Sequence, residues 1–228
     1  MFSSFAHRLQ KSELMDDLTR PEREFDEAYR ELAIINRRLG GIRAIERFLP
    51  GNADAEREPD RAKPKEILML DVAAGGCDVG EALIDKRGAR VVSLDLCYKG
   101  LKFARKSWPL VGDAMELPFA DNTFDVVMAS LFFHHLSESQ CVRAFRNMWR
   151  VSRGLVLVND LHRHPLAYVS IRLLTARFSN SVMVRHDGPV SVLRAFKPQD
   201  LLHIANEAGV PARVHRSFPF RLVLVARK

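Results

Sequence analysis

Short apolar runs that stop at acidic residues or glycines recur in the middle of the chain. The first run ends at Asp71 and the second at Asp95, which lies 24 residues further on (from 71 to 95). A third run, residues 124–130, follows a segment that contains Gly112 and Asp113. Runs at this spacing, with room for a helix between them, predict successive strand–helix units of a parallel sheet. The chain is therefore predicted to be an α/β protein.

The region before the sheet has the pattern of helices. In residues 22–39, apolar side chains recur at steps of three and four residues, which predicts an amphipathic helix. Gly40 and Gly41 end this helix, and a second short helix is predicted over residues 42–48. Residues 52–65 are polar, charged and proline-containing, which indicates a surface linker. We therefore divide the chain into an N-terminal helical cover (1–51), a linker (52–65) and a main domain (66–228).

The second half of the main domain continues the same alternation. We predict a helix over residues 137–150, a fifth strand over 154–159 and a helix over 199–208, with an insertion at about 160–198 that includes a loop at 185–188. Residues 210–217 and 220–226 are separated by little more than Pro219. They predict an antiparallel hairpin that completes the sheet.

The ends of the first strands carry residue types that suit a nucleoside pocket. Ala73, Ala74, Gly75 and Gly76 follow the first strand, and their small size lets backbone N–H groups approach a ligand. Asp95 ends the second strand, where a doubly wound sheet places an acid that accepts hydrogen bonds from ribose hydroxyls. The pattern indicates that a nucleoside binds at this edge.

A third block of sequence identifies a family. Gly112-Asp113-Ala114, then Leu117-Pro118-Phe119, Asp121 and Phe124–Val127 follow one another in the order seen in class I S-adenosylmethionine-dependent methyltransferases, which the chain resembles over Glu66–Phe145. Within that family it most resembles ubiquinone/menaquinone-type C-methyltransferases and O-methyltransferases of phenolic, polyketide and other small secondary metabolites. The resemblance implies S-adenosyl-L-methionine as cofactor. It also implies a Rossmann-like seven-stranded sheet with a C-terminal hairpin, and N-terminal helices over the cofactor and substrate mouth, with packing against the sheet edge as the alternative.

The resemblance also assigns cofactor contacts. It implies that Asp71 and the turn from Ala73 to Gly76 hold the methionine end, and that Asp95 holds the ribose hydroxyls. The remaining contacts that it implies are Leu96 against the adenine, Asp113 and the Ala114 N–H on the adenine edge, and Ser130 beside the sulfonium.

The chain departs from the family pattern at Ala73 and Cys77, where glycine is usual. Alanine at position 73 costs little if its φ is negative. The departure leaves two further readings open: a partner or regulatory protein that has lost cofactor binding, and an NAD site, although NAD binding favours a fuller glycine turn. Carboxylates at three strand ends argue against the first, because unpaired carboxylates repel one another.

Methyl transfer from a sulfonium is an in-line displacement, so it needs alignment, plus a base where the acceptor is protonated. Asp160 and His162 lie two residues apart at a strand exit, where we expect them to share a face so that the carboxylate orients the imidazole. Arg163 would then hold an anionic or phenolate acceptor. Further candidate bases are His135, His134 and the pair His186–Asp187. No metal site is predicted, because the His162/His164 pair lacks carboxylate partners at a defining spacing.

The net charge of +7 is concentrated in the C-terminal part of the chain. Residues 150–228 contain 13 Lys/Arg and 4 Asp/Glu, whereas residues 1–149 contain 22 and 24. We find no nucleic-acid-binding module there, so nucleic acid is not an expected partner, and RNA methylation ranks behind a small-molecule acceptor. The basic half suits a solvated surface, an anionic substrate, an acidic carrier protein or a peripheral membrane contact.

Apolar residues near the two strand exits, Phe132, Phe133 and several in 166–174, favour a small, aromatic or hydrophobic acceptor. Three cysteines without metal spacing, and an N-terminal segment interrupted by charges, predict a cytoplasmic protein. The sequence leaves open the oligomeric state and the choice between O- and C-methylation.

Overall fold

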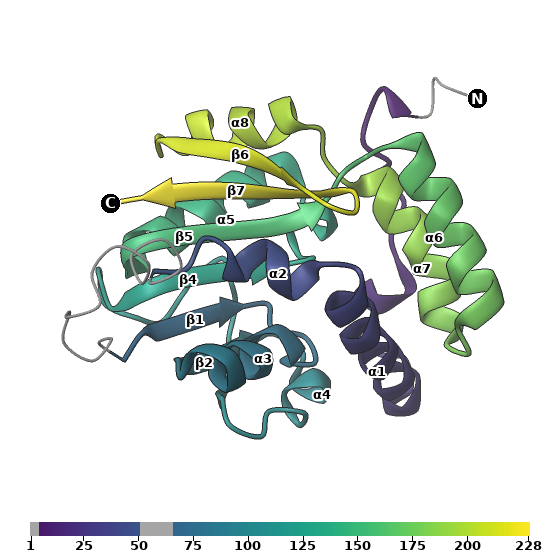
Figure 1. The fold of residues 1–228 in the computed structure, drawn as a ribbon, viewed down its shortest axis with the longest axis horizontal. Coiled ribbons are helices and arrows are strands. Elements are labelled where there is room, and N and C mark those ends of the chain that lie inside the picture. The colour runs from purple at the N-terminus through teal and green to yellow at the C-terminus, as the bar shows by residue number, and fades with distance from the viewer. Residues whose placement is uncertain (1–4, 51–65) are drawn as a thin grey trace.

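The computed structural model describes residues 5–50 and 66–228 and is built around one seven-stranded sheet (Figure 1). The strand order is β3-β2-β1-β4-β5-β7-β6. The strands are β1 (Leu68–Val72), β2 (Arg90–Asp95), β3 (Trp108–Val111), β4 (Phe124–Ser130), β5 (Ser152–Leu161), β6 (Ala212–Ser217) and β7 (Arg221–Arg227). The predicted linker, 52–65, lies outside the described residues.

Helices flank the sheet and cover its carboxyl edge. They are α1 (Glu22–Arg38), α2 (Gly41–Glu46), α3 (Asp78–Arg87), α4 (Tyr98–Leu101), α5 (Glu138–Val151), α6 (Pro165–Phe178), α7 (Val182–Arg194) and α8 (Pro198–Glu207). Two short 3-10 turns, η2 (Leu14–Asp16) and η3 (Phe133–His135), complete the elements used below.

The pairing of the strands confirms the predicted sheet. Strands β3, β2, β1, β4 and β5 are parallel, β7 is antiparallel to β5, and β6 and β7 form the expected hairpin. Because the first five strands run in one direction, their carboxyl ends share one edge, and open α/β sheets bind ligands at that edge.

Apolar clusters on the two faces of the sheet hold the helices in place. On β1, Leu70 and Val72 belong to the cluster that includes Phe145 of α5, whereas Met69 belongs to the cluster that includes Leu83 of α3. Successive strand side chains point to opposite faces, so a strand covered on both sides is apolar throughout. This explains the uninterrupted apolar runs of the sequence.

The N-terminal helix α1 lies across the carboxyl edge beside α7, and α6 packs on α7 in turn (Figure 1). Phe25 and Tyr29 of α1 form a third buried cluster with Met183 and Val184 of α7. The helix therefore takes the covering position that the family resemblance implies rather than packing along an outer strand.

The expected loop at residues 185–188 is wrong, because these residues lie inside helix α7. Ser181 caps the helix, since its hydroxyl accepts a hydrogen bond from the Val184 N–H at 3.3 Å. Gly188 and Pro189 suggest a turn in sequence. In the structure, Gly188 allows α6 to approach closely: an added Cβ would lie 3.2 Å from Ile171 and 3.3 Å from Thr175.

Candidate functional site

The loop after β1 is held tightly between two helices. A Cβ added to Gly100 of α4 would lie 2.1 Å from the Gly75 carbonyl oxygen, so the helix backbone packs directly on the loop. On the other side, a Cβ added to Gly76 would lie 3.0 Å from Cβ of Tyr29. The loop is therefore fixed in one conformation between α4 and α1.

The loop has the backbone of a glycine-rich turn although two glycines are replaced. Ala73 has φ 55° and Cys77 has φ 61°, both in the left-handed region, and Gly75 between them has φ 51°. The condition under which alanine would cost little at position 73, a negative φ, is therefore not met. A side chain in this region costs roughly 1–2 kcal/mol, so the chain keeps the turn at the expense of strain. Burial raises the pKa of the Cys77 thiol to about 12, which makes it an unreactive packing group.

Asp95 organises the next strand end. Its two carboxylate oxygens accept hydrogen bonds from the backbone N–H of Gly75 at 2.8 Å and of Cys97 at 2.7 Å. Burial raises the pKa of Asp95, and these two bonds oppose the rise. Because a carboxylate has about four acceptor positions, Asp95 can still accept from ribose hydroxyls. Leu96 beside it is 60% exposed, as an apolar side chain that meets an adenine face would be.

The turn after β3 faces the same corner. The Asp113 carboxylate accepts a hydrogen bond from the Met115 N–H at 2.8 Å, and Asp113 itself is exposed. Ala114, which lies between these two residues in the sequence, is buried. The residues predicted for the adenosine end of the cofactor therefore stand at the neighbouring ends of β2 and β3.

At the end of β4 the chain makes a second strained turn. Ser130 accepts a hydrogen bond from the Asn159 side chain at 2.9 Å, and the next residue, Leu131, has φ 55°. Left-handed conformations of residues other than glycine concentrate at functional sites. Leu131 lines the main cavity of the molecule, so this turn joins the cofactor side of the sheet edge to that cavity.

A cavity of about 510 Å³ lies between the sheet edge, α1, α6, α7 and the β6–β7 turn. Its volume suits a small molecule. The apolar side chains that line it include Leu32, Ile35, Leu39, Leu131, Leu161, Ile171, Leu174, Met183, Val184 and Phe218, and the polar ones include Glu13, Arg38, Arg43, His134, His135, Asp187, Ser191 and Arg221.

The structure pairs Asp160 with His134 and not with His162. The Asp160 carboxylate lies 2.7 Å from Nδ1 of His134 and accepts the His134 N–H at 3.1 Å. Both side chains are buried. Burial alone would raise the pKa of Asp160, but the charge and hydrogen bond of His134 outweigh it and lower the pKa.

His162 faces a different recess. Strand β5 ends at Leu161, and His162 then bridges to Phe196, so the two-residue repeat of the strand no longer applies. Its ring lies 5.6 Å from the ring of His164, and burial together with the charge of Arg216 lowers its pKa. The expectation that Asp160 orients His162 is therefore wrong.

His135 has a carboxylate partner of its own. Its Nδ1 lies 2.6 Å from the Asp16 carboxylate. Burial would raise the pKa of Asp16, but the hydrogen bond and charge of His135 lower it. Both imidazoles thus have Nδ1 held by an acid, and Nε2 of each lies within 4 Å of Glu13: 3.7 Å for His134 and 3.9 Å for His135.

Glu13 is the residue that sequence reasoning missed. It is 5% exposed, one carboxylate oxygen accepts the Ser191 hydroxyl at 2.8 Å, and Arg194 Nε lies 3.6 Å from the other. Burial raises its pKa from 4.5 to about 7. The available signal was the pair Glu13 and Asp16, which has capping-box spacing and forms that box around η2.

Three further polar residues hold the N-terminal segment in place. Arg163 donates to the carbonyls of Phe5 and Ala195 and to the Asp200 carboxylate, so it does not reach the main cavity and the expectation that it holds the acceptor is wrong. Arg194 donates to the carbonyls of His134 and His135 and to Asp16. Asp187, expected in a loop, accepts the N–H groups of Leu14 and Met15 from within α7.

Glu13 and the two histidines beside it also form the one group of three among the described residues that could hold a metal ion. Glu13, His134 and His135 each offer a ligand atom within 4.8 Å of the others. A carboxylate on the second nitrogen of each histidine is a usual feature of metal sites. However, Arg194 already places a cation 3.6 Å from Glu13, and Ser191 already occupies an oxygen of its carboxylate. The polar surroundings therefore favour proton transfer over metal binding.

Comparisons with known proteins agree with this geometry. Residues 70–157 match the family model described as "Methyltransferase domain". Residues 70–157 are therefore similar to a methyltransferase domain, as the sequence resemblance predicts. The demethylmenaquinone methyltransferase of Renibacterium salmoninarum is 38% identical over 102 residues, which cover 42% of this chain and 42% of that protein. That of Thermobifida fusca is 36% identical over 110 residues, 43% of this chain and 45% of that protein. The chain thus spans less than half the length of these curated relatives.

Solved structures share the fold of the methyltransferase domain. Human N-acetylserotonin methyltransferase in complex with S-adenosylmethionine has a TM-score of 0.66 at 14% identity, covering 96% of this chain and 60% of that one. A methyltransferase from Aquifex aeolicus that depends on S-adenosylmethionine has a TM-score of 0.54 at 17% identity, covering 82% and 97%. At these identities the likeness establishes the fold, and it confirms the predicted Rossmann-like sheet with its C-terminal hairpin.

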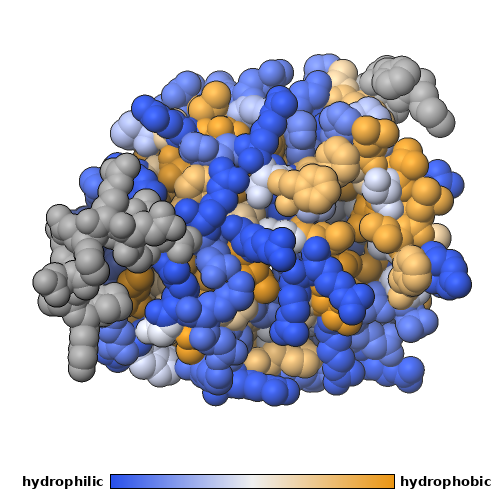
Figure 2. Space-filling model, in the orientation of Figure 1, coloured by the Kyte–Doolittle hydropathy of each residue, from blue (hydrophilic) through white to orange (hydrophobic). Residues whose placement is uncertain are grey.

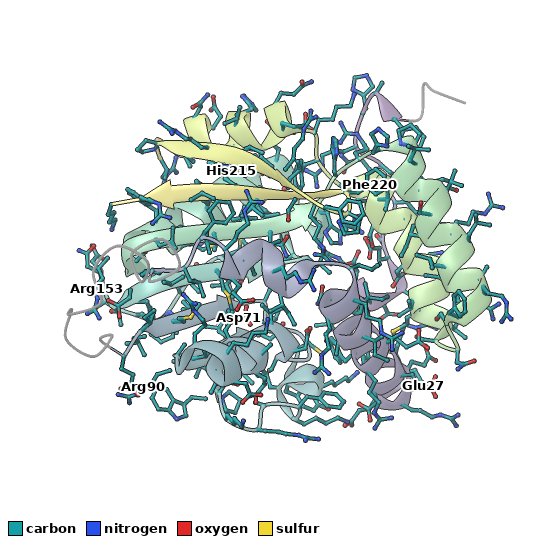
Figure 3. All side chains as sticks on the ribbon, in the orientation of Figure 1. Glu27, Asp71, Arg90, Arg153, His215 and Phe220 are labelled. Carbon is teal, nitrogen blue, oxygen red and sulfur yellow. The ribbon has the colours of Figure 1, made fainter. Side chains whose placement is uncertain are left out.

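S-adenosylmethionine, the cofactor of this class of domain, fits the charges at the sheet edge. Asp71, labelled in Figure 3, lies at the end of β1 beside α3, and its Oδ2 has no hydrogen-bond partner among the described residues. Burial, with the charges of Asp78 and Asp95, raises its pKa well above the usual value. A ligand with a sulfonium and an ammonium group would relieve this accumulation of acids. The individual contacts of all the predicted residues with the cofactor, from Asp71 to Ser130, stay predictions.

Proposed function

We propose that the protein transfers a methyl group from S-adenosylmethionine to a hydroxyl oxygen of a small aromatic or otherwise hydrophobic metabolite. The observation that carries the proposal is the buried His134–Asp160 pair, which stands at the wall of an apolar cavity next to the strained turn after β4. A hydroxyl acceptor needs a base, and an imidazole held by a carboxylate is a suitable one.

The chain supplies the proton transfer. Because Asp160 accepts a hydrogen bond from Nδ1 of His134, the proton of the neutral ring resides on Nδ1 and Nε2 is free to act as the base. When the hydroxyl proton moves to Nε2, Asp160 stabilises the imidazolium. Glu13, 3.7 Å from Nε2, has a pKa of about 7 and can accept the proton in turn. S-adenosylmethionine, when bound, supplies the electrophilic methyl group.

The cavity supports the class of acceptor. Its lining is predominantly apolar, and three of its polar residues, His134, His135 and Ser191, gather around the Glu13 carboxylate. This arrangement would leave a ring or chain in apolar surroundings while a hydroxyl meets His134. The relatives and structural neighbours include enzymes named for demethylmenaquinone and N-acetylserotonin, both small molecules. C-methylation of a quinol ring is the second candidate, favoured by the first of these names.

Replacing the base tests the proposal. We expect His134→Ala to lower kcat by about 10²–10⁴-fold with the dissociation constant for S-adenosylmethionine unchanged by calorimetry. His162→Ala is the matched control, because that histidine faces the other recess, and it should keep full turnover. The acceptors assayed would be phenols and quinols, with the methylated atom identified by mass spectrometry and NMR. Full turnover of His134→Ala would show that His134 is not the base. A C-methylated product would show that the acceptor is a carbon atom instead of a hydroxyl oxygen.

Two measurements, cofactor binding and the identity of the methylated acceptor, distinguish this function from that of a partner protein and from RNA methylation. A partner or regulatory protein would not bind S-adenosylmethionine, and an RNA methyltransferase would transfer methyl groups to tRNA in a salt-dependent way. Calorimetry and a tRNA assay distinguish the three. We also propose a reducing, cytoplasmic setting and a role in secondary metabolism, supported by three free, buried cysteines and by the apolar acceptor cavity.

A further inference from the structure

Helix α6 and the first residue of α7 present an apolar face to solvent. Leu166, Val169 and Leu173 recur at three- and four-residue steps and so lie on one side of α6. The exposed fractions of the apolar residues in this patch are 61% for Leu166, 51% for Val169, 65% for Leu173, 73% for Phe178 and 62% for Val182. Figure 2 shows the hydrophobic surface that they form over α6, on the right of the view. We call these five residues the α6 patch.

The charge around the α6 patch is mainly positive. Between Asp160 and Asp187 the sequence contains no acidic residue. Arg172, Arg177 and Arg185 are exposed within this stretch. Glu31 of α1 is an acid beside the patch, but its carboxylate already accepts the Ser179 hydroxyl and the N–H groups of Asn180 and Ser181. An apolar face with a mainly cationic border is the pattern of helices that lie on anionic membranes.

The patch is continuous with the mouth of the acceptor cavity. Leu174 of α6 is 40% exposed and also lines the cavity, and Phe218 at the end of the β6–β7 hairpin is 90% exposed and lines it too. Figure 3 labels Phe220 at the turn of this hairpin, where β7 begins beside α6 and α7. An apolar path therefore runs from the α6 patch into the cavity.

We propose that the α6 patch docks on an anionic lipid bilayer and that an acceptor with an apolar tail enters the cavity directly from the membrane. The second part rests on the proposed function, and the docking does not. Docking would be peripheral, since no helix in residues 5–50 and 66–228 is long and apolar enough to cross a bilayer.

The charges favour a bilayer over a second copy of the chain. In a twofold dimer the same patch meets itself, so the exposed arginines of the two copies would be brought together. The acid beside the patch, Glu31, is already bonded to Asn180 and Ser181. Phosphate groups of anionic lipids neutralise such arginines, and the acyl region accepts the apolar side chains. The bilayer is therefore the occupant that satisfies both features of the surface.

Vesicle flotation of the full chain tests the docking. The probes are vesicles of phosphatidylcholine alone and of phosphatidylcholine mixed with phosphatidylglycerol. We expect binding to the mixed vesicles that weakens as salt increases, and a loss of at least about tenfold in bound protein for Val169→Asp/Leu173→Asp. Leu202→Asp on α8, an apolar residue 38% exposed and outside the α6 patch, is the control and should bind as the parent does.

Absence of binding by the parent chain would overturn the proposal, and so would an equal loss in the Leu202→Asp control. Sedimentation velocity without vesicles gives a further test: a dimer that Val169→Asp/Leu173→Asp converts to a monomer would assign the patch to a second copy instead. Circular dichroism and the affinity for S-adenosylmethionine establish that the variants fold. Normal turnover of a water-soluble phenol by Val169→Asp/Leu173→Asp, with vesicle binding lost, would separate the docking from the proposed chemistry.

Discussion

The cofactor side and the acceptor side of the sheet edge are built in different ways. On the cofactor side, the Asp95 carboxylate accepts hydrogen bonds from the N–H groups of Gly75 and Cys97, and the Asp113 carboxylate accepts one from the Met115 N–H. All these residues lie within one continuous stretch of the sequence. On the acceptor side, Glu13 bonds to Ser191 and Asp16 to Arg194, each pair 178 residues apart. A local motif can therefore describe the first side, whereas only the folded chain assembles the second.

The two sides should also respond differently to mutation. Asp160→Asn keeps the shape of the side chain but no longer fixes the proton on Nδ1 of His134. We expect kcat to fall by about 10²–10⁴-fold, as for a base held in the wrong tautomer, with cofactor affinity unchanged. Single-turnover kinetics and calorimetry measure the two quantities. Because Asp160 is fully buried, the unfolding midpoint must be measured as well; a normal midpoint with normal turnover would remove the pair from the mechanism.

The acceptor side should make stability depend on pH. The pKa of Glu13 in the folded protein is about 7, above its value of 4.5 when solvated. Its protonated form therefore favours folding: this contribution is complete below pH 4.5 and is lost as the pH rises through 7. The loss corresponds to about 3 kcal/mol.

Glu13→Gln should remove that dependence. We expect the variant to be more stable than the parent at about pH 8 and to lose this advantage near pH 4.5, as measured by urea unfolding at both pH values. Glu116→Gln, at an exposed side chain, is the matched control and should leave the profile unchanged. If the parent and Glu13→Gln have parallel profiles, the pKa of Glu13 in the folded protein is not raised, and its carboxylate is then too weak a base to be the favoured acceptor of the proton from His134.

On the cofactor side, Asp95→Ala should weaken S-adenosylmethionine binding. The variant loses the ribose acceptor and also frees the N–H groups of Gly75 and Cys97 that fix the loop. We expect a loss of about 1–3 kcal/mol in binding free energy. Calorimetry is the measurement, with Asp121→Ala, at the exposed turn before β4, as the control. Unchanged affinity for Asp95→Ala would place the ribose elsewhere.

The same contrast explains what can be predicted from sequence. The apolar run at residues 124–130 has the observed limits of β4. Asp95 and Asp113 lie at the ends of the neighbouring strands β2 and β3, and their contacts with a cofactor stay predictions. The expected partner of Asp160, His162, is wrong, because Asp160 pairs with His134 from the neighbouring strand end. Alternation along one strand cannot reveal a contact between two strands.

The rest of the acceptor side depends on packing that has no local signature. Glu13 precedes the first amphipathic helix and reaches the cavity only because Asp187 and Arg194 of α7 hold its segment. The sequence predicts a loop inside α7, since Gly188 and Pro189 normally mark turns. Close packing against α6 overrides that preference.

The smallest predicted effect tests the strained loop of the cofactor side. Ala73 has φ 55°, which glycine adopts freely, so Ala73→Gly relieves strain of roughly 1–2 kcal/mol but gives back about 0.4–1 kcal/mol through the greater freedom of the unfolded chain. We expect a net gain of about 0.5–1 kcal/mol in the free energy of unfolding. Ala74→Gly, one residue on and without a left-handed φ, is the matched control and should lose about 0.5–1 kcal/mol. Chemical denaturation measures the change in the free energy of unfolding of each variant. Changes of opposite sign would show that the loop keeps a glycine conformation without its glycine. A loss in both variants would mean that Ala73 is unstrained in solution and that the loop has departed from the family turn.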